Sequence, residues 1–161
     1  MEQKSKLLVA LLALSFVNWV ALNYYCTLNV SSKLFDVHIF GYELNYAKQL
    51  ITNLSEQEIE TYRSMYTGLD LTMPILMFLD ATIVISMLYP YGSVSGALAH
   101  LCPLLFLIFE LLENHALYTV LTLYITNKPY DINTITIESL LTNASFYTSS
   151  KFLTLSKSSQ L

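Results

Sequence analysis

The sequence predicts an all-α integral membrane protein: a four-helix up-down bundle with a helical extramembrane loop between its first and second helices. Of its 161 residues, 54% are hydrophobic and only 12% are charged, about half the charged share of an ordinary soluble domain. Four segments run for about 20 residues or more with few charges, a length that crosses a bilayer. Short links join the last three segments, which favours antiparallel neighbours.

The composition also excludes several classes of protein. With 8 Lys plus Arg against 12 Asp plus Glu, the chain has no excess of cations for binding nucleic acid. Cys26 and Cys102 form neither a metal-ligand spacing nor a disulfide framework. Phosphate-binding loops and metalloprotease motifs are absent from the sequence, so we predict no metal and no cofactor. The length predicts a single membrane domain, residues 1–161.

The first predicted span covers about residues 7–26. Asp, Glu, Lys and Arg are absent from Leu7 to Ser32, and Lys4 and Lys6 precede this run. A basic start and an apolar centre also fit a signal peptide, but no convincing cleavage site of small residues follows. We therefore expect an uncleaved membrane helix.

The second predicted span covers about residues 68–90 and contains Asp70, Pro74 and Asp80. The third covers about residues 96–124 and is long for one crossing, so we expect it to tilt or to extend beyond the bilayer.

The fourth predicted span, about residues 135–155, is the weakest by hydropathy. It is rich in Thr and Ser and carries Glu138 and Lys151. It becomes a credible span only if its hydroxyl groups are buried against other helices. With four spans, both termini are expected on one side of the membrane.

Residues 27–67 form the predicted extramembrane loop, and their pattern is helical. Ser55 followed by Glu58 is typical of a capping box, which predicts a helix running from residue 55 to 88 with a kink near Pro74. Proline at this position leaves the carbonyl oxygen of Asp70 without its usual helical donor. Upstream, a short helix is predicted on the membrane surface or across the end of the bundle. The prediction comes from the helical spacing of Tyr42, Tyr46, Leu50 and Leu54.

The charged and polar residues of the predicted spans are the candidate site, because a charge at the bilayer centre costs about 2.5–3.5 kcal/mol on insertion scales. Helical spacing puts those of the third span on one face. We predict that Lys151 pairs with Glu113, the acid deepest in its span, with Asn114 bridging. The candidate polar cluster is Asp70, Glu110, Glu113, Asn114, Thr148 and Lys151. Its interpretation stays open between structural hydrogen bonding and a functional site.

The order of several short motifs resembles that of a group of small four-span membrane proteins, mainly bacterial, whose activity is uncharacterised. The motifs are Gly41-Tyr42, Tyr62, Leu69-Asp70, Pro74, Leu112-Glu113-Asn114, Thr148 and Lys151. Glu110 stands one position away from an acid that the group usually carries before its Leu-Glu-Asn. The resemblance covers about residues 41–155 and implies a four-helix fold with a shared polar cluster. It implies no activity.

Three functions remain open from the sequence. The first is a non-catalytic structural or accessory subunit of a larger membrane assembly, because the predicted bundle has no sizeable soluble domain. The second is a bundle that binds or carries a lipid or small molecule. The third is an intramembrane enzyme that uses a buried carboxyl group. The expected partners are the lipid bilayer, other membrane subunits and a bound lipid, with no nucleic acid.

Overall fold

The computed structural model describes residues 2–29, 41–90, 92–126 and 135–158, and the regular elements within these ranges are helices. The predicted all-α class is confirmed. Residues 30–40 of the predicted loop lie outside the described residues. The helices are α1 (Glu2–Asn29), α2 (Leu44–Asn53), α3 (Glu56–Thr67), α4 (Leu69–Leu88), α5 (Val94–Thr126) and α6 (Ile135–Ser158).

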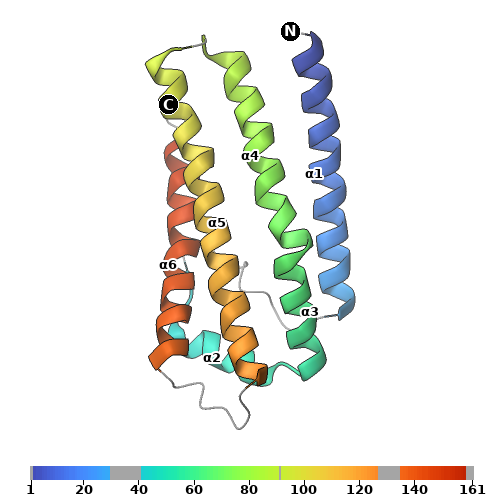
Figure 1. Ribbon diagram of the computed structural model, residues 1–161, viewed down its shortest axis with the longest axis vertical. Helices are drawn as coiled ribbons and strands as arrows, with labels where there is room; N and C mark the ends of the chain where they lie inside the picture. Colours follow the sequence, from blue (N-terminus) through green and yellow to red (C-terminus); the bar gives the residue numbers. More distant parts are fainter. Residues whose placement is uncertain (1, 30–40, 91, 127–134, 159–161) are drawn as a thin grey trace.

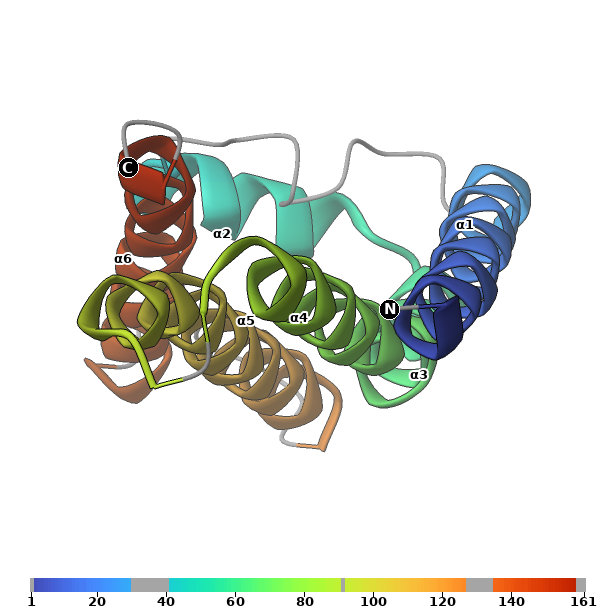
Figure 2. The same ribbon diagram turned by 90° about the horizontal axis from the view of Figure 1, so that it is seen from above.

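The four long helices run in alternating directions, as predicted, but they form an open layer (Figure 1). Seen from above, α4 lies between α1 and α5, and α6 packs on the other side of α5 (Figure 2). The main neighbours of α1 are α4 and α3, so the layer does not close on itself. The described helices therefore do not form a closed four-helix bundle.

Three of the four predicted spans have the length and composition of a membrane helix. They lie in Glu2–Tyr25, Glu56–Leu88 and Val94–Thr126. Helix α6 is long enough, but it does not qualify as a candidate span because its Ser and Thr residues lower its hydropathy. The three apolar helices are consistent with a protein that crosses the membrane several times.

Helices α3 and α4 are nearly the continuous helix that the sequence predicts. The Ser55 hydroxyl accepts a hydrogen bond from the Glu58 backbone N–H at 3.3 Å, and the Glu58 carboxylate accepts one from the Ser55 N–H at 2.9 Å. The predicted capping box is confirmed. The one interruption is Gly68, whose φ of −116° and ψ of −104° are not helical, while Pro74 lies within α4.

Replacing Ser55 with Ala is expected to lower the free energy of unfolding by about 1 kcal/mol, because it removes the cap of α3. Chemical unfolding in detergent measures the loss. Thr61→Ala is the matched control, since the Thr61 hydroxyl only donates to the Gln57 carbonyl of its own helix. Equal losses in the two variants would mean that the capping box adds no stability.

The buried core lies at one end of the layer, where α2 crosses it (Figure 1). We call this region the packed end and define it as residues 42–67, 113–126 and 136–151. The predicted short helix is confirmed as α2, and its buried face covers the end of the layer. The side chains of this core include Ala47, Leu50, Ile51, Ile59, Tyr62, Met65, Leu117, Val120, Leu121, Ile137, Leu141 and Ala144.

The rest of the layer exposes large apolar side chains; we call it the apolar end and define it as residues 2–21 of α1, residues 71–88 of α4 and residues 94–112 of α5. In α5 the last exposed large apolar side chain is Leu112. The next residue, Glu113, is buried, and most of the buried residues of α5 follow it. Along α3, which is fully described, the exposed positions are polar. Exposed apolar side chains on α4 and α5 include Leu71, Ile75, Leu79, Val84, Leu88, Leu98, Leu101, Leu104 and Ile108.

Candidate functional site: a buried charge cluster

Lys151 on α6 forms ion pairs with two acids of α5, close to the junction of the packed end and the apolar end. Its ammonium nitrogen lies 2.8 Å from Glu113 Oε2 and 2.9 Å from Glu110 Oε1. Glu113 is fully buried and Lys151 is 3% exposed. The predicted pairing of Lys151 with Glu113 is confirmed, and Glu110 joins it because residues three apart share a helix face.

Thr148 completes the surroundings of Glu113. Its hydroxyl donates to Glu113 Oε1 at 2.6 Å and also lies 3.0 Å from the Ala144 carbonyl oxygen one turn earlier in α6. Thr148 and Lys151 are three residues apart, so α6 presents both to the same carboxylate. Each oxygen of Glu113 therefore has a partner on α6.

Asn114 connects this cluster to α4 in a way that differs from the prediction. Its side-chain amide donates to the backbone carbonyl oxygen of Asp70 at 3.4 Å, so the predicted bridge between Lys151 and Glu113 is not formed. Pro74 has no N–H to offer that carbonyl, and the amide of Asn114 takes its place. The sequence located the freed carbonyl correctly but assigned Asn114 to the wrong partner.

A second set of polar contacts joins α1 to α4, and sequence reasoning missed it. The hydroxyl of Ser15 donates to Asp80 Oδ2 at 2.7 Å, and the amide of Asn18 donates to the Leu69 carbonyl at 3.1 Å. The Thr72 hydroxyl lies 2.9 Å from Asn18 Oδ1 and 2.8 Å from the Leu69 carbonyl oxygen, and either can accept its proton. Ser15 and Asn18 are three residues apart and buried, so their spacing on one face was the available signal.

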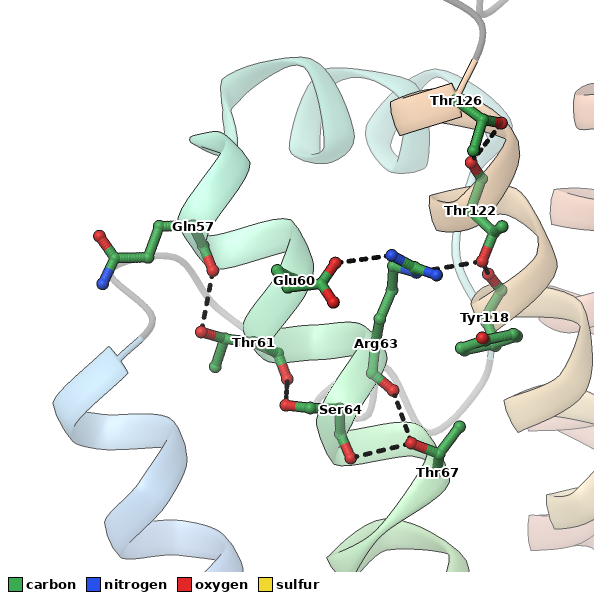
Figure 3. A network of polar contacts seen from close by, with 9 residues as sticks. All are labelled: Gln57, Glu60, Thr61, Arg63, Ser64, Thr67, Tyr118, Thr122 and Thr126. Carbon is green, nitrogen blue, oxygen red and sulfur yellow. Dashed lines mark hydrogen bonds and ion pairs between the residues drawn. The ribbon is translucent and has the colours of Figure 1, made fainter.

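Arg63 joins α3 to α5 within the packed end (Figure 3). Its guanidinium pairs with Glu60 at 2.6 Å and donates to the Thr122 hydroxyl at 3.1 Å. It also lies over the ring of Tyr118, with 5.4 Å from its central carbon to the ring centroid. The helix that carries Arg63 was predicted from the sequence, but its contacts with Thr122 and Tyr118 of α5 were not.

The serine-rich face of α6 is buried against the segment that leads into α2. The Ser145 hydroxyl accepts a hydrogen bond from the Tyr42 N–H at 2.9 Å and donates to the Tyr42 carbonyl at 2.8 Å. Gly41 has a φ of +83°, and a Cβ atom there would lie 2.6 Å from the Ser149 hydroxyl. Lys48 of α2 pairs with Glu138 of α6 in the same region. The backbone N–H and carbonyl of Tyr42 thus bond to the Ser145 hydroxyl, whereas the sequence predicted that the hydroxyl groups of α6 would be buried against other helices.

The geometry of the cluster favours a stabilising role. A buried carboxylate with partners on both oxygens has no atom free to reach a substrate, and its contacts hold α6 against α5. A cavity of about 550 Å³ lies elsewhere, between the end of α4 and the start of α5, and Glu113 does not line it. Over the described residues, no group of three or more His, Cys, Asp or Glu is placed to hold a metal ion.

Comparisons of the chain with protein-family models, with curated proteins and with solved structures found no match. The case for a function therefore depends on the geometry.

Proposed function

We propose that this chain is a non-catalytic integral membrane protein that serves as an accessory subunit of a larger membrane assembly. The observation that carries the proposal is the open layer, whose apolar end exposes large apolar side chains on α1, α4 and α5. Monomeric soluble proteins rarely expose apolar patches larger than a few hundred Å². Lipid covers part of such a surface, and α1, at the edge of the layer, offers a face to a neighbouring membrane helix.

The state of the buried charges supports a non-catalytic role. Lys151 and Thr148 both bond to Glu113, and all three residues are buried. A general acid needs an atom within hydrogen-bond reach of its substrate. The cluster instead resembles the polar contacts that hold membrane helices together.

The change in exposed side chains supports one particular depth in the bilayer. Residues 71–88 and 94–112 are about 27 Å and about 28 Å long at about 1.5 Å per residue, close to the hydrocarbon thickness of about 30 Å. We place the hydrocarbon boundary at the level of Asp70 and Glu113, with the packed end beyond it. In this placement the cluster lies at the edge of the hydrocarbon, where its charges cost less than at the centre that the sequence predicted.

Photo-crosslinking from α1 tests the proposed role. Val9 and Phe16, which are 67% and 63% exposed, are replaced one at a time by a photoreactive amino acid in membranes of the natural host. We expect a discrete protein adduct of constant mass from one of these positions. Gln57, an exposed residue of the packed end, is the matched control and should not give that adduct. Lipid adducts alone from both α1 positions would contradict the role of a subunit.

Labelling of single cysteines tests the topology. In a parent chain lacking Cys26 and Cys102, Lys4→Cys and Lys157→Cys are expected to react with an impermeant maleimide from the same side. The beginning of α1 and the end of α6 lie toward the same end of the layer (Figure 1). Gln57→Cys should react from the opposite side. Reaction of residues 4 and 157 from opposite sides would remove either α1 or α6 from the membrane-crossing helices.

A further inference from the structure

The cavity of about 550 Å³ at the turn between α4 and α5 has the size of a small-molecule site. Its lining residues belong to the end of α4, the start of α5 and the turn between them. These segments lie at the opposite end of the layer from α2 and the packed end (Figure 1). The lining of the cavity is mostly apolar, and its polar groups include the side chains of Ser86, Ser93 and His100. A few polar groups in an apolar hollow are typical of sites that orient one end of a ligand.

The hydrogen bonds of His100 define what that ligand must supply. Its Nδ1 lies 2.6 Å from the Gly96 carbonyl oxygen, which only accepts, so Nδ1 carries the proton. The Ser86 hydroxyl donates its single proton to the Thr82 carbonyl at 2.7 Å. The same hydroxyl lies 3.4 Å from His100 Nε2, so this is the longer and weaker of its two contacts. With the proton on Nδ1, Nε2 of the neutral ring is an acceptor that a better-placed donor can reach.

The wall of the cavity is fixed by a close approach at Gly96. A Cβ atom there would lie 2.8 Å from the Ser93 hydroxyl oxygen and 3.1 Å from Tyr89 Cβ, too close for any larger residue without rearrangement. The Gly96 N–H also donates to the Ser93 hydroxyl at 3.1 Å. Gly96 thus places His100 one turn later at a set distance from α4.

We infer that this cavity binds the hydroxyl head of an uncharged lipid of the diacylglycerol class. The hydroxyl donates to His100 Nε2, and the acyl chains lie along the exposed side chains of Leu98 and Leu101, which line the cavity. Among the described residues that line the cavity there is no Lys or Arg to pair with a phosphate or carboxylate. A fully ionised anionic head also carries no proton for Nε2. The inference is independent of the proposed subunit role.

Native mass spectrometry of the full chain in detergent tests the inference with dioleoylglycerol as the probe. Binding is expected to weaken at least tenfold in His100→Leu, which removes the acceptor, and to stay unchanged in His115→Leu. His115 is an exposed histidine of the same helix, at the packed end. Dioleoyl phosphatidic acid, which has the same acyl chains, should bind more weakly than dioleoylglycerol. Equal binding by the two histidine variants, or stronger binding of phosphatidic acid, would overturn the inference.

Nitrogen NMR of the ¹⁵N-histidine-labelled wild-type chain gives a readout that does not depend on how the variants fold. Adding dioleoylglycerol should shift the Nε2 resonance of His100 in the direction of a hydrogen-bonded acceptor and leave that of His115 in place. An unchanged His100 resonance at saturating lipid would overturn the proposed contact.

Discussion

Lys151→Met is expected to lower the free energy of unfolding by about 3–5 kcal/mol, because it leaves buried carboxylates without their counter-charge. Glu113→Gln, which removes the deeper carboxylate, should cost less than Lys151→Met, because the buried ammonium keeps Glu110 as its counter-charge. The double variant is expected to lose less than the sum of the two. Glu110 can keep its charge in that variant because its side chain is 17% exposed. Chemical unfolding in detergent, run as a double-mutant cycle, measures these differences.

Lys48 and Glu138 provide the matched cycle, since this pair has the same residue types and also joins α6 to another element. Their side chains are 15% and 37% exposed, against 4% and 0% for Lys151 and Glu113. Solvent screening should hold the coupling of Lys48→Met and Glu138→Gln to about 1 kcal/mol or less. If the losses in the Lys151 cycle simply add, burial gives that pair no special coupling and the account of the cluster is wrong.

Gly41→Ala is expected to destabilise the chain by roughly 3 kcal/mol. Two costs combine: a side chain in the left-handed region costs about 1–3 kcal/mol, and overpacking costs about 1–3 kcal/mol. The added Cβ would lie 2.6 Å from the Ser149 hydroxyl and 2.9 Å from the Ser145 carbonyl oxygen. Unfolding in detergent measures the loss, and displacement of Tyr42 from α6 should accompany it.

Gly92→Ala separates the two costs. Gly92 has a φ of +80°, nearly that of Gly41, but an added Cβ would meet no atom within 4 Å. The Gly92 variant should therefore show only the conformational cost. Equal losses at the two glycines would mean that the contact of Gly41 with α6 is not tight.

The sequence predicted two kinds of contact. One is set by the spacing of residues within one helix, and the other follows from the scarcity of charged partners. Ser55 and Glu58 form their capping box within four residues. Lys151 is the only Lys or Arg inside the predicted spans after the first, so it was the one candidate partner for Glu113. Contacts of neutral side chains with distant helices were not predictable from charge. Ser15 and Asn18 change a hydropathy count little, and their partners Asp80, Leu69 and Thr72 are more than 50 residues away in the sequence.

The openness of the layer was also beyond sequence reasoning. Apolar residues surround α1 on all sides, so its composition does not distinguish a face that meets a helix from one that meets lipid. The low hydropathy of α6 was visible in the sequence, but the contacts that its Ser and Thr residues make were not. Its hydroxyl groups belong in part to the contact between Ser145 and Tyr42, which requires Gly41 more than one hundred positions earlier.

The order of the cluster along the chain has a consequence for biogenesis. Glu110 and Glu113 leave the ribosome well before Lys151, so a nascent chain that reaches the membrane first holds two acids on α5 without their cation. Synthesis of α6 then supplies the ammonium and the Thr148 hydroxyl together. A chain that stops before residue 151 keeps that imbalance, which disfavours stable residence of α5 in lipid. The contact between α5 and α6 therefore forms only after residue 151 has been made, when both acids of α5 are already in place.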